Sequence, residues 1–153
     1  MVKTKTAESL KNIFDTPPLT RARMVDFGDK STLSLPPDFL EGLRLETAAS
    51  YAILIVSQSH NVIRIIPTGS KSVIKISIEI SELSPHFLED LTRLFSRLNI
   101  KALYSTGLVF TIENCFYEVF FDLNELPIPN DCFEAEVKNI RGVSGVEMKV
   151  LAC

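Results

Sequence analysis

Cysteine, histidine and long apolar runs are all scarce in this chain of 153 residues. The three cysteines are widely spaced and odd in number, and no CxxC pair occurs. This pattern argues against a disulfide framework and against metal or redox chemistry, and it predicts reduced thiols in a cytoplasmic protein. We expect Cys115 and Cys132 to be half-buried packing residues.

Catalytic motifs are also lacking. HExxH, GxSxG and P-loop patterns do not occur in the sequence. The two histidines, His60 at a predicted hairpin tip and His86 at a predicted helix start, are most simply interpreted as exposed polar side chains. Gly107, isolated within a strand-like run, is more typical of a bulge than of a phosphate-binding loop. The sequence therefore predicts a protein that is not an enzyme and uses no cofactor.

The chain lacks both membrane signals and a positive charge excess. No apolar run approaches the roughly 20 residues that span a bilayer, and the N-terminus has no continuous apolar core of the kind that marks a signal peptide. We therefore expect no membrane partner. The net charge of −3 argues against a globally basic nucleic-acid binder. Residues 1–70 hold 8 Lys and Arg against 7 Asp and Glu, whereas residues 71–153 hold 8 against 12.

The second half begins with a predicted strand and helix. Alternation at residues 73–80 predicts a half-buried strand. Its residues on one face are Ile74, Ile76, Ile78 and Ile80. A helix is expected to open at Ser84 and Pro85, because serine caps free N–H groups and proline suits the first helical position. Asn99 is expected to end it. The apolar stripe of this helix comprises Phe87, Leu88, Leu91, Leu94, Phe95 and Leu98.

Two strands, a second helix and a closing strand are predicted to follow. Residues 101–112 and 115–123 flank a short polar turn and indicate a hairpin. Asn130 or Asp131 can cap the second helix. The buried positions of that helix would be Phe133, Val137 and Ile140, and residues 146–150 alternate as the last strand.

This order of strand, helix, strand, strand, helix and strand, with residues 140–146 leading into the last strand, resembles the ACT domain. The resemblance covers about half of the chain. It implies a ferredoxin-like fold, one antiparallel four-stranded sheet with two helices on one face, that pairs with another copy and binds an amino acid or a similar effector. The corresponding family turn lies at residues 81–86, where the family's proline is present and its glycine is not. Free N–H groups at this helix start favour a carboxylate, and the expected ligand-binding residues are Glu82, Leu83, Ser84 and His86.

The first half has a pattern of its own. Strand-like runs at residues 24–27 and 32–35 precede Pro36 and Pro37, and a short helix is expected over residues 38–45. A hairpin at residues 51–56 and 62–66, ended by Pro67, completes the pattern.

Residues 33–40, 43–45 and 63–67 resemble the AbrB-like swapped-hairpin family. The resemblance implies that strands from two chains interleave into one dimeric barrel, and many members of the family bind duplex DNA. A module this short buries too little apolar surface to be stable alone, and its open edges need a partner. A homodimer is therefore expected.

The basic residues expected to contact DNA are Arg21, Arg23 and Lys30, which lie where the family carries such groups. The family's helix arginines correspond to Leu40 and Glu41 here, and a carboxylate repels phosphate. Two alternatives therefore stay open: a DNA-binding dimer, or a module that only dimerises.

The predicted fold class is α+β, with an N-terminal swapped-hairpin β-barrel-type dimer module and a C-terminal ferredoxin-like βαββαβ domain. The predicted divisions are an arm at residues 1–20, the AbrB-like domain at 21–68, a linker at 69–72 and the ACT-like domain at 73–153. The predicted function is a non-enzymatic, dimeric, DNA-binding-type transcriptional regulator with a small-molecule sensor. The alternative is a dimerising protein that regulates a partner enzyme without binding DNA.

Overall fold

The computed structural model describes residues 20–26, 49–57, 60 and 62–153. These residues form two antiparallel sheets and two α-helices, so the predicted α+β class is confirmed. The N-terminal arm before residue 20, the predicted strand at 32–35, the predicted helix at 38–45 and Lys30 all lie outside the described residues.

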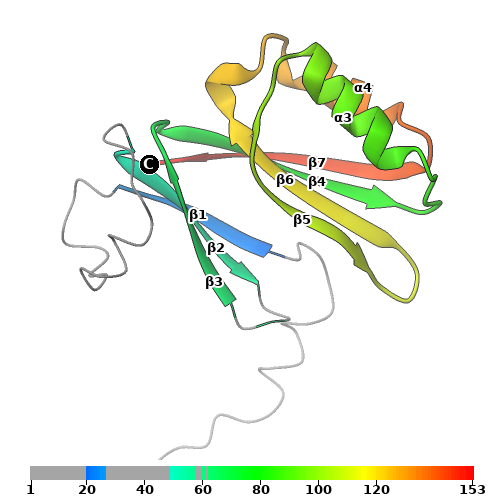
Figure 1. The fold of residues 1–153 in the computed structure, drawn as a ribbon, viewed down its shortest axis with the longest axis horizontal. Coiled ribbons are helices and arrows are strands. Elements are labelled where there is room, and N and C mark those ends of the chain that lie inside the picture. The colour runs from blue at the N-terminus through cyan, green and yellow to red at the C-terminus, as the bar shows by residue number, and fades with distance from the viewer. Residues whose placement is uncertain (1–19, 27–48, 58–59, 61) are drawn as a thin grey trace, which may run out of the picture.

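The second half of the chain forms a four-stranded sheet with two helices on one face (Figure 1). The strand order is β5-β6-β4-β7, and every pair is antiparallel. The elements follow one another along the chain in the expected order. They are β4 (Ser72–Ile80), α3 (Phe87–Arg97), β5 (Ala102–Phe110), β6 (Cys115–Asp122), the 3-10 turn η2 (Leu123–Glu125), α4 (Asn130–Lys138) and β7 (Val143–Ala152).

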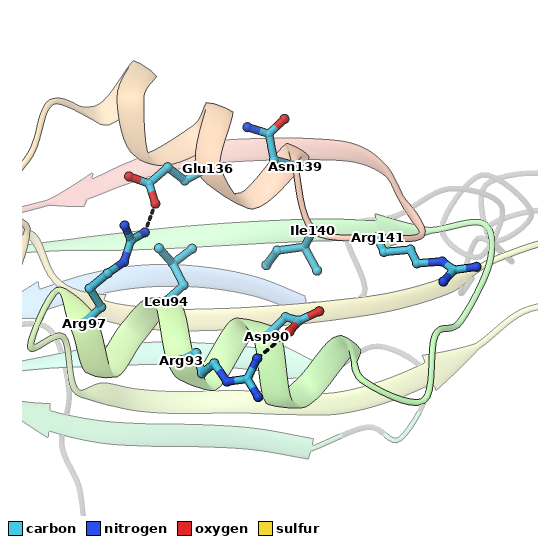
Figure 2. Close-up of a pocket in the computed structure, with 8 residues that line it drawn as sticks. All are labelled: Asp90, Arg93, Leu94, Arg97, Glu136, Asn139, Ile140 and Arg141. Atoms are coloured by element: carbon cyan, nitrogen blue, oxygen red, sulfur yellow. Dashed lines mark hydrogen bonds and ion pairs between the residues drawn. The ribbon is translucent and has the colours of Figure 1, made fainter.

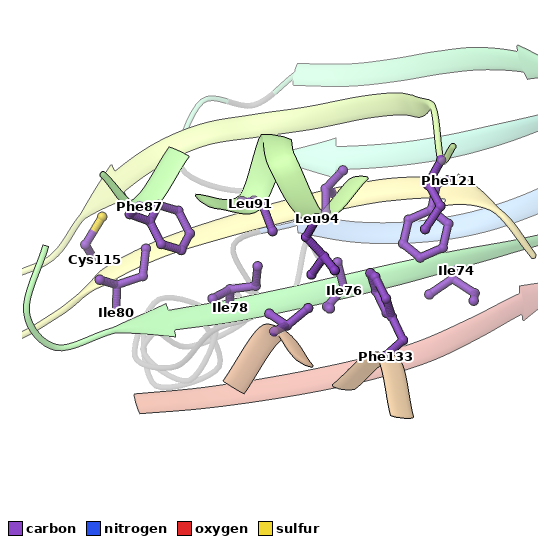
Figure 3. Close-up of a cluster of buried hydrophobic side chains, with 13 residues drawn as sticks. Ile74, Ile76, Ile78, Ile80, Phe87, Leu91, Leu94, Cys115, Phe121 and Phe133 are labelled. Atoms are coloured by element: carbon purple, nitrogen blue, oxygen red, sulfur yellow. The ribbon is translucent and has the colours of Figure 1, made fainter. Parts of the chain in front are cut away.

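The face of β4 that carries the isoleucines forms one side of the main core (Figure 3). The apolar sides of both helices pack on this face. Helix α3 contributes Phe87, Leu91 and Leu94, and helix α4 contributes Phe133 and Val137. Burying each such side chain stabilises the fold by about 1.5–3 kcal/mol. The apolar face of β4, which repeats every second residue, and the apolar stripe of α3 therefore pack together in one core. Its fully buried isoleucines are Ile74, Ile76, Ile78 and Ile80.

The boundaries of α3 differ in part from the expectation. The helix begins at Phe87 and not at Ser84, because residues 85–86 form a turn before it. The Ser84 hydroxyl oxygen accepts a hydrogen bond from the His86 N–H at 3.2 Å, which is the kind of capping contact predicted for this serine. Asn99 has a φ of 55° in the left-handed region, and it ends the helix as expected.

A second layer covers the face of the four-stranded sheet opposite the helices (Figure 1). It is a three-stranded antiparallel sheet in the order β1-β2-β3. Its strands are β1 (Thr20–Asp26), β2 (Tyr51–Ser57) and β3 (Val62–Thr68). Strand β1 lies beside β7, and β3 lies beside β5. The two sheets share a second core made of Met24, Ile53, Ile55, Val73, Phe120 and Leu151.

Among the described residues this layer is an open sheet and not a barrel, and the expected barrel-type dimer module stays a prediction. Its edges β1 and β3 each pair only with β2 among the described strands, so both edges are open to a further strand. The predicted linker at residues 69–72 is held in place. Ser70 is buried, and its hydroxyl donates to the Ser72 carbonyl at 2.9 Å. Ser72 is already the first residue of β4.

Candidate functional site

The predicted ligand-binding residues lie together on the turn between β4 and α3. Glu82, Leu83 and His86 are exposed, and Ser84 is half-buried. The His86 ring nitrogen Nδ1 lies 3.3 Å from the Glu89 carboxylate on the first turn of α3. The four predicted residues therefore lie on the turn that precedes α3, with three of them exposed.

Hydrogen bonds join this turn to the turn that connects α4 to β7. The Gly142 carbonyl accepts hydrogen bonds from the N–H groups of Ser81 at 3.1 Å and Glu82 at 3.4 Å. Gly142 has a φ of 90°, and a Cβ at this position would lie 1.9 Å from the Glu82 carbonyl oxygen. Only glycine fits both demands. The N–H groups of Ser81 and Glu82 donate to Gly142, and those of His86 and Phe87 donate to Ser84, so all four are already bonded within the protein.

A shallow groove of about 630 Å³ runs between α3 and α4 on the outer surface (Figure 2). Sequence reasoning missed it, since its two walls come from helices whose proximity is a tertiary feature. An ion pair between Arg97 and Glu136 joins the two helices across the groove. The lining residues are Asp90, Arg93, Leu94, Arg97, Glu136, Asn139, Ile140 and Arg141.

A buried ion pair lies on the opposite face of the same sheet. The Lys75 ammonium is 2.9 Å from the Glu118 carboxylate, and the two side chains are only 7% and 2% exposed. The Ser77 hydroxyl donates to the same carboxylate at 3.1 Å. The backbone N–H of Glu118 donates to the Thr106 hydroxyl at 3.0 Å. These buried polar groups satisfy one another's hydrogen-bonding capacity away from water. The ion pair therefore has a structural role between the two sheets.

Two of the expected DNA-binding residues, Arg21 and Arg23, lie on β1, an edge of the three-stranded sheet. Arg21 stands opposite Val56 and Arg23 opposite Leu54 in the register with β2. Met24 stands opposite the fully buried Ile53 and belongs to the second core. The two arginines therefore occupy alternate positions along one strand, separated by one residue.

The cysteines and histidines have simple environments. Cys115 is fully buried in the main core and not half-buried as expected, and burial raises the pKa of its thiol, which favours the neutral form. Cys132 is exposed, so the expectation of a half-buried packing residue was wrong there, because it lies on the outer side of the first turn of α4. His60 and His86 are both exposed, as predicted.

Within the described ranges, no three His, Cys, Asp or Glu side chains lie close enough to hold a metal ion. In the same part of the chain, no helix has the length and apolar character needed to cross a membrane. No protein-family model matches the chain, and a comparison with curated proteins found none similar to it.

Proposed function

We propose that the chain is a non-enzymatic regulatory protein whose second half is a ferredoxin-like, ACT-type sensor of a small molecule. One observation carries this proposal: the sheet order β5-β6-β4-β7 with βαββαβ connectivity and both helices on one face. That arrangement is the one the ACT resemblance implies. The effector is an amino acid or a similar molecule.

The effector site in this proposal is the β4–α3 turn with Glu82, Leu83, Ser84 and His86. The start of α3 favours an anionic group through its helix dipole, while the N–H groups of His86 and Phe87 already donate to Ser84. The link to Gly142 holds the turn against the start of β7. Strand β7 also contributes Leu151 to the core shared with the three-stranded sheet. Binding at the turn can therefore influence the first half of the chain through packed elements.

Calorimetry against the twenty amino acids tests this site. We expect saturable binding of at least one of them. The double variant Ser84→Ala/His86→Ala should weaken it by about tenfold or more, since each lost hydrogen bond to a charged group is worth about 1.5–3 kcal/mol. Ser96→Ala, an exposed serine near the other end of the same helix, is the matched control and should leave affinity unchanged. Binding that is the same in all three proteins would place the site elsewhere.

A dimeric DNA-binding regulator is the form of this function that Arg21 and Arg23 on the edge strand β1 support. In it, both arginines and Lys30 neutralise DNA phosphates. Arg23→Gln should then lower affinity for all duplex sequences alike and reduce the salt slope by about one to two units, because each residue counts twice in a dimer. Glu41→Arg should raise affinity. Fluorescence anisotropy with random duplex DNA at two salt concentrations measures both effects.

Lys101→Gln is the control for this experiment, because this exposed cation precedes β5 at the far edge of the four-stranded sheet. It should change neither affinity nor slope. A folded monomer at micromolar concentration in sedimentation velocity would contradict the dimer. Equal, salt-insensitive signals from all variants would instead favour the alternative, a dimerising protein that regulates a partner enzyme without DNA.

A further inference from the structure

We propose that the groove between α3 and α4 is a second binding site, and that it takes a small organic anion, a carboxylate or phosphate, carrying an apolar group. This site is separate from the effector site at the β4–α3 turn and does not depend on it. None of the four turn residues lines the groove (Figure 2).

The charges of the groove favour an anion. Three guanidinium groups line it, from Arg93, Arg97 and Arg141, against the two carboxylates of Asp90 and Glu136. This local excess of positive charge stands out in the half of the chain where acidic residues outnumber basic ones. Planar guanidinium groups match the geometry of carboxylate and phosphate oxygens.

Arg141 supplies the cation that is ready for a ligand. It is exposed, and no acidic partner pairs with it among the residues the structure describes. Arg93 lies 3.5 Å from Asp90 and also pairs with Glu89, so it is engaged on its own helix. An anion entering the groove therefore meets Arg141 without having to break an ion pair there.

The pair between Arg97 and Glu136 lies at the end of the groove opposite Arg141 (Figure 2). Their side chains are 63% and 35% exposed, and ion pairs this accessible contribute little to stability. An anion bound at Arg141 therefore leaves this pair intact. Glu136 opposes the anion only as one of the two carboxylates that line the groove.

Two apolar side chains of the groove can pack against the apolar part of the ligand. Leu94 of α3 and Ile140, just after α4, lie between the charged residues along the groove (Figure 2). The volume of about 630 Å³ falls within the range of small-molecule sites, which is about 300–1,000 Å³. A charged head with an apolar body fits this lining better than a bare inorganic ion.

Methyl NMR titration of the full chain tests the proposal, with 4-phenylbutyrate and phenyl phosphate as probes and 4-phenylbutanol as the neutral counterpart. At least one anion should shift the methyl signals of Leu94 and Ile140 saturably, and the alcohol should not. Arg141→Gln should weaken the binding by about tenfold, the effect of losing one charge-assisted hydrogen bond. Glu136→Gln should strengthen it by about threefold, because one of the two carboxylates that repel an anion from the groove is gone.

Lys149→Gln is the matched control, since it removes one exposed positive charge on β7, outside the groove. It should leave the binding unchanged. The proposal is overturned if neither anion gives saturable shifts, if the alcohol binds as well as the anions, or if Lys149→Gln weakens binding as much as Arg141→Gln. Spectra of the free variants that match the parent show that each one folds.

Discussion

Replacing Glu118 by alanine is expected to lower the free energy of unfolding by about 3–5 kcal/mol, because it removes one member of a buried ion pair. The Lys75 ammonium, 2.9 Å from this carboxylate, would stay in the interior without that counter-charge. The Ser77 hydroxyl would also lose its acceptor. The loss should appear in urea unfolding as a lower midpoint with an unchanged slope.

The double variant Lys75→Met/Glu118→Leu separates the cost of a broken pair from the worth of the intact one. Apolar replacements of similar volume often match or exceed a buried ion pair in stability. We therefore expect the double variant to be more stable than Glu118→Ala. A double variant no more stable than Glu118→Ala would show that the uncompensated Lys75 charge does not account for the loss.

The substitution Gly142→Ala is expected to cost about 3 kcal/mol, at the upper end of the range for a residue forced into an unfavourable backbone conformation. Two penalties combine, since φ is 90° and the new Cβ would lie 1.9 Å from the Glu82 carbonyl oxygen. The β4–α3 turn must move to relieve this contact. On the proposed function, amino-acid binding at Ser84 and His86 should therefore weaken, whereas the proposed DNA binding through β1 should not.

Gly107→Ala is the matched control for that prediction. Gly107 also has a positive φ, of 72°, but a Cβ there meets nothing within 4 Å. Its replacement should cost only about 1–2 kcal/mol, the penalty for a left-handed residue. Equal losses from the two substitutions, measured by urea unfolding, would show that the contact with Glu82 has no energetic weight.

Local periodicity in the sequence was enough to predict the elements of the second half. The alternating isoleucines of β4 and the helical stripe of α3 are visible without a structure, because each pattern repeats within a single element. Gly107 was also predicted correctly as a bulge, since the register between β5 and β6 shifts between Ser105 and Leu108. The start of α3 was misplaced at Ser84, because a serine before a proline caps a turn as readily as a helix.

The pairings between elements were decided only by the tertiary structure. Lys75 and Glu118 meet because β4 and β6 pair in one particular register, and no local signal links two residues so far apart in the chain. Arg97 and Glu136 meet because both helices pack on the same face of the sheet. Hydrophobic patterns show which face of each element is buried, but they do not show which other element packs against that face. The core shared by the two sheets and the groove between the helices both depend on which elements pack together.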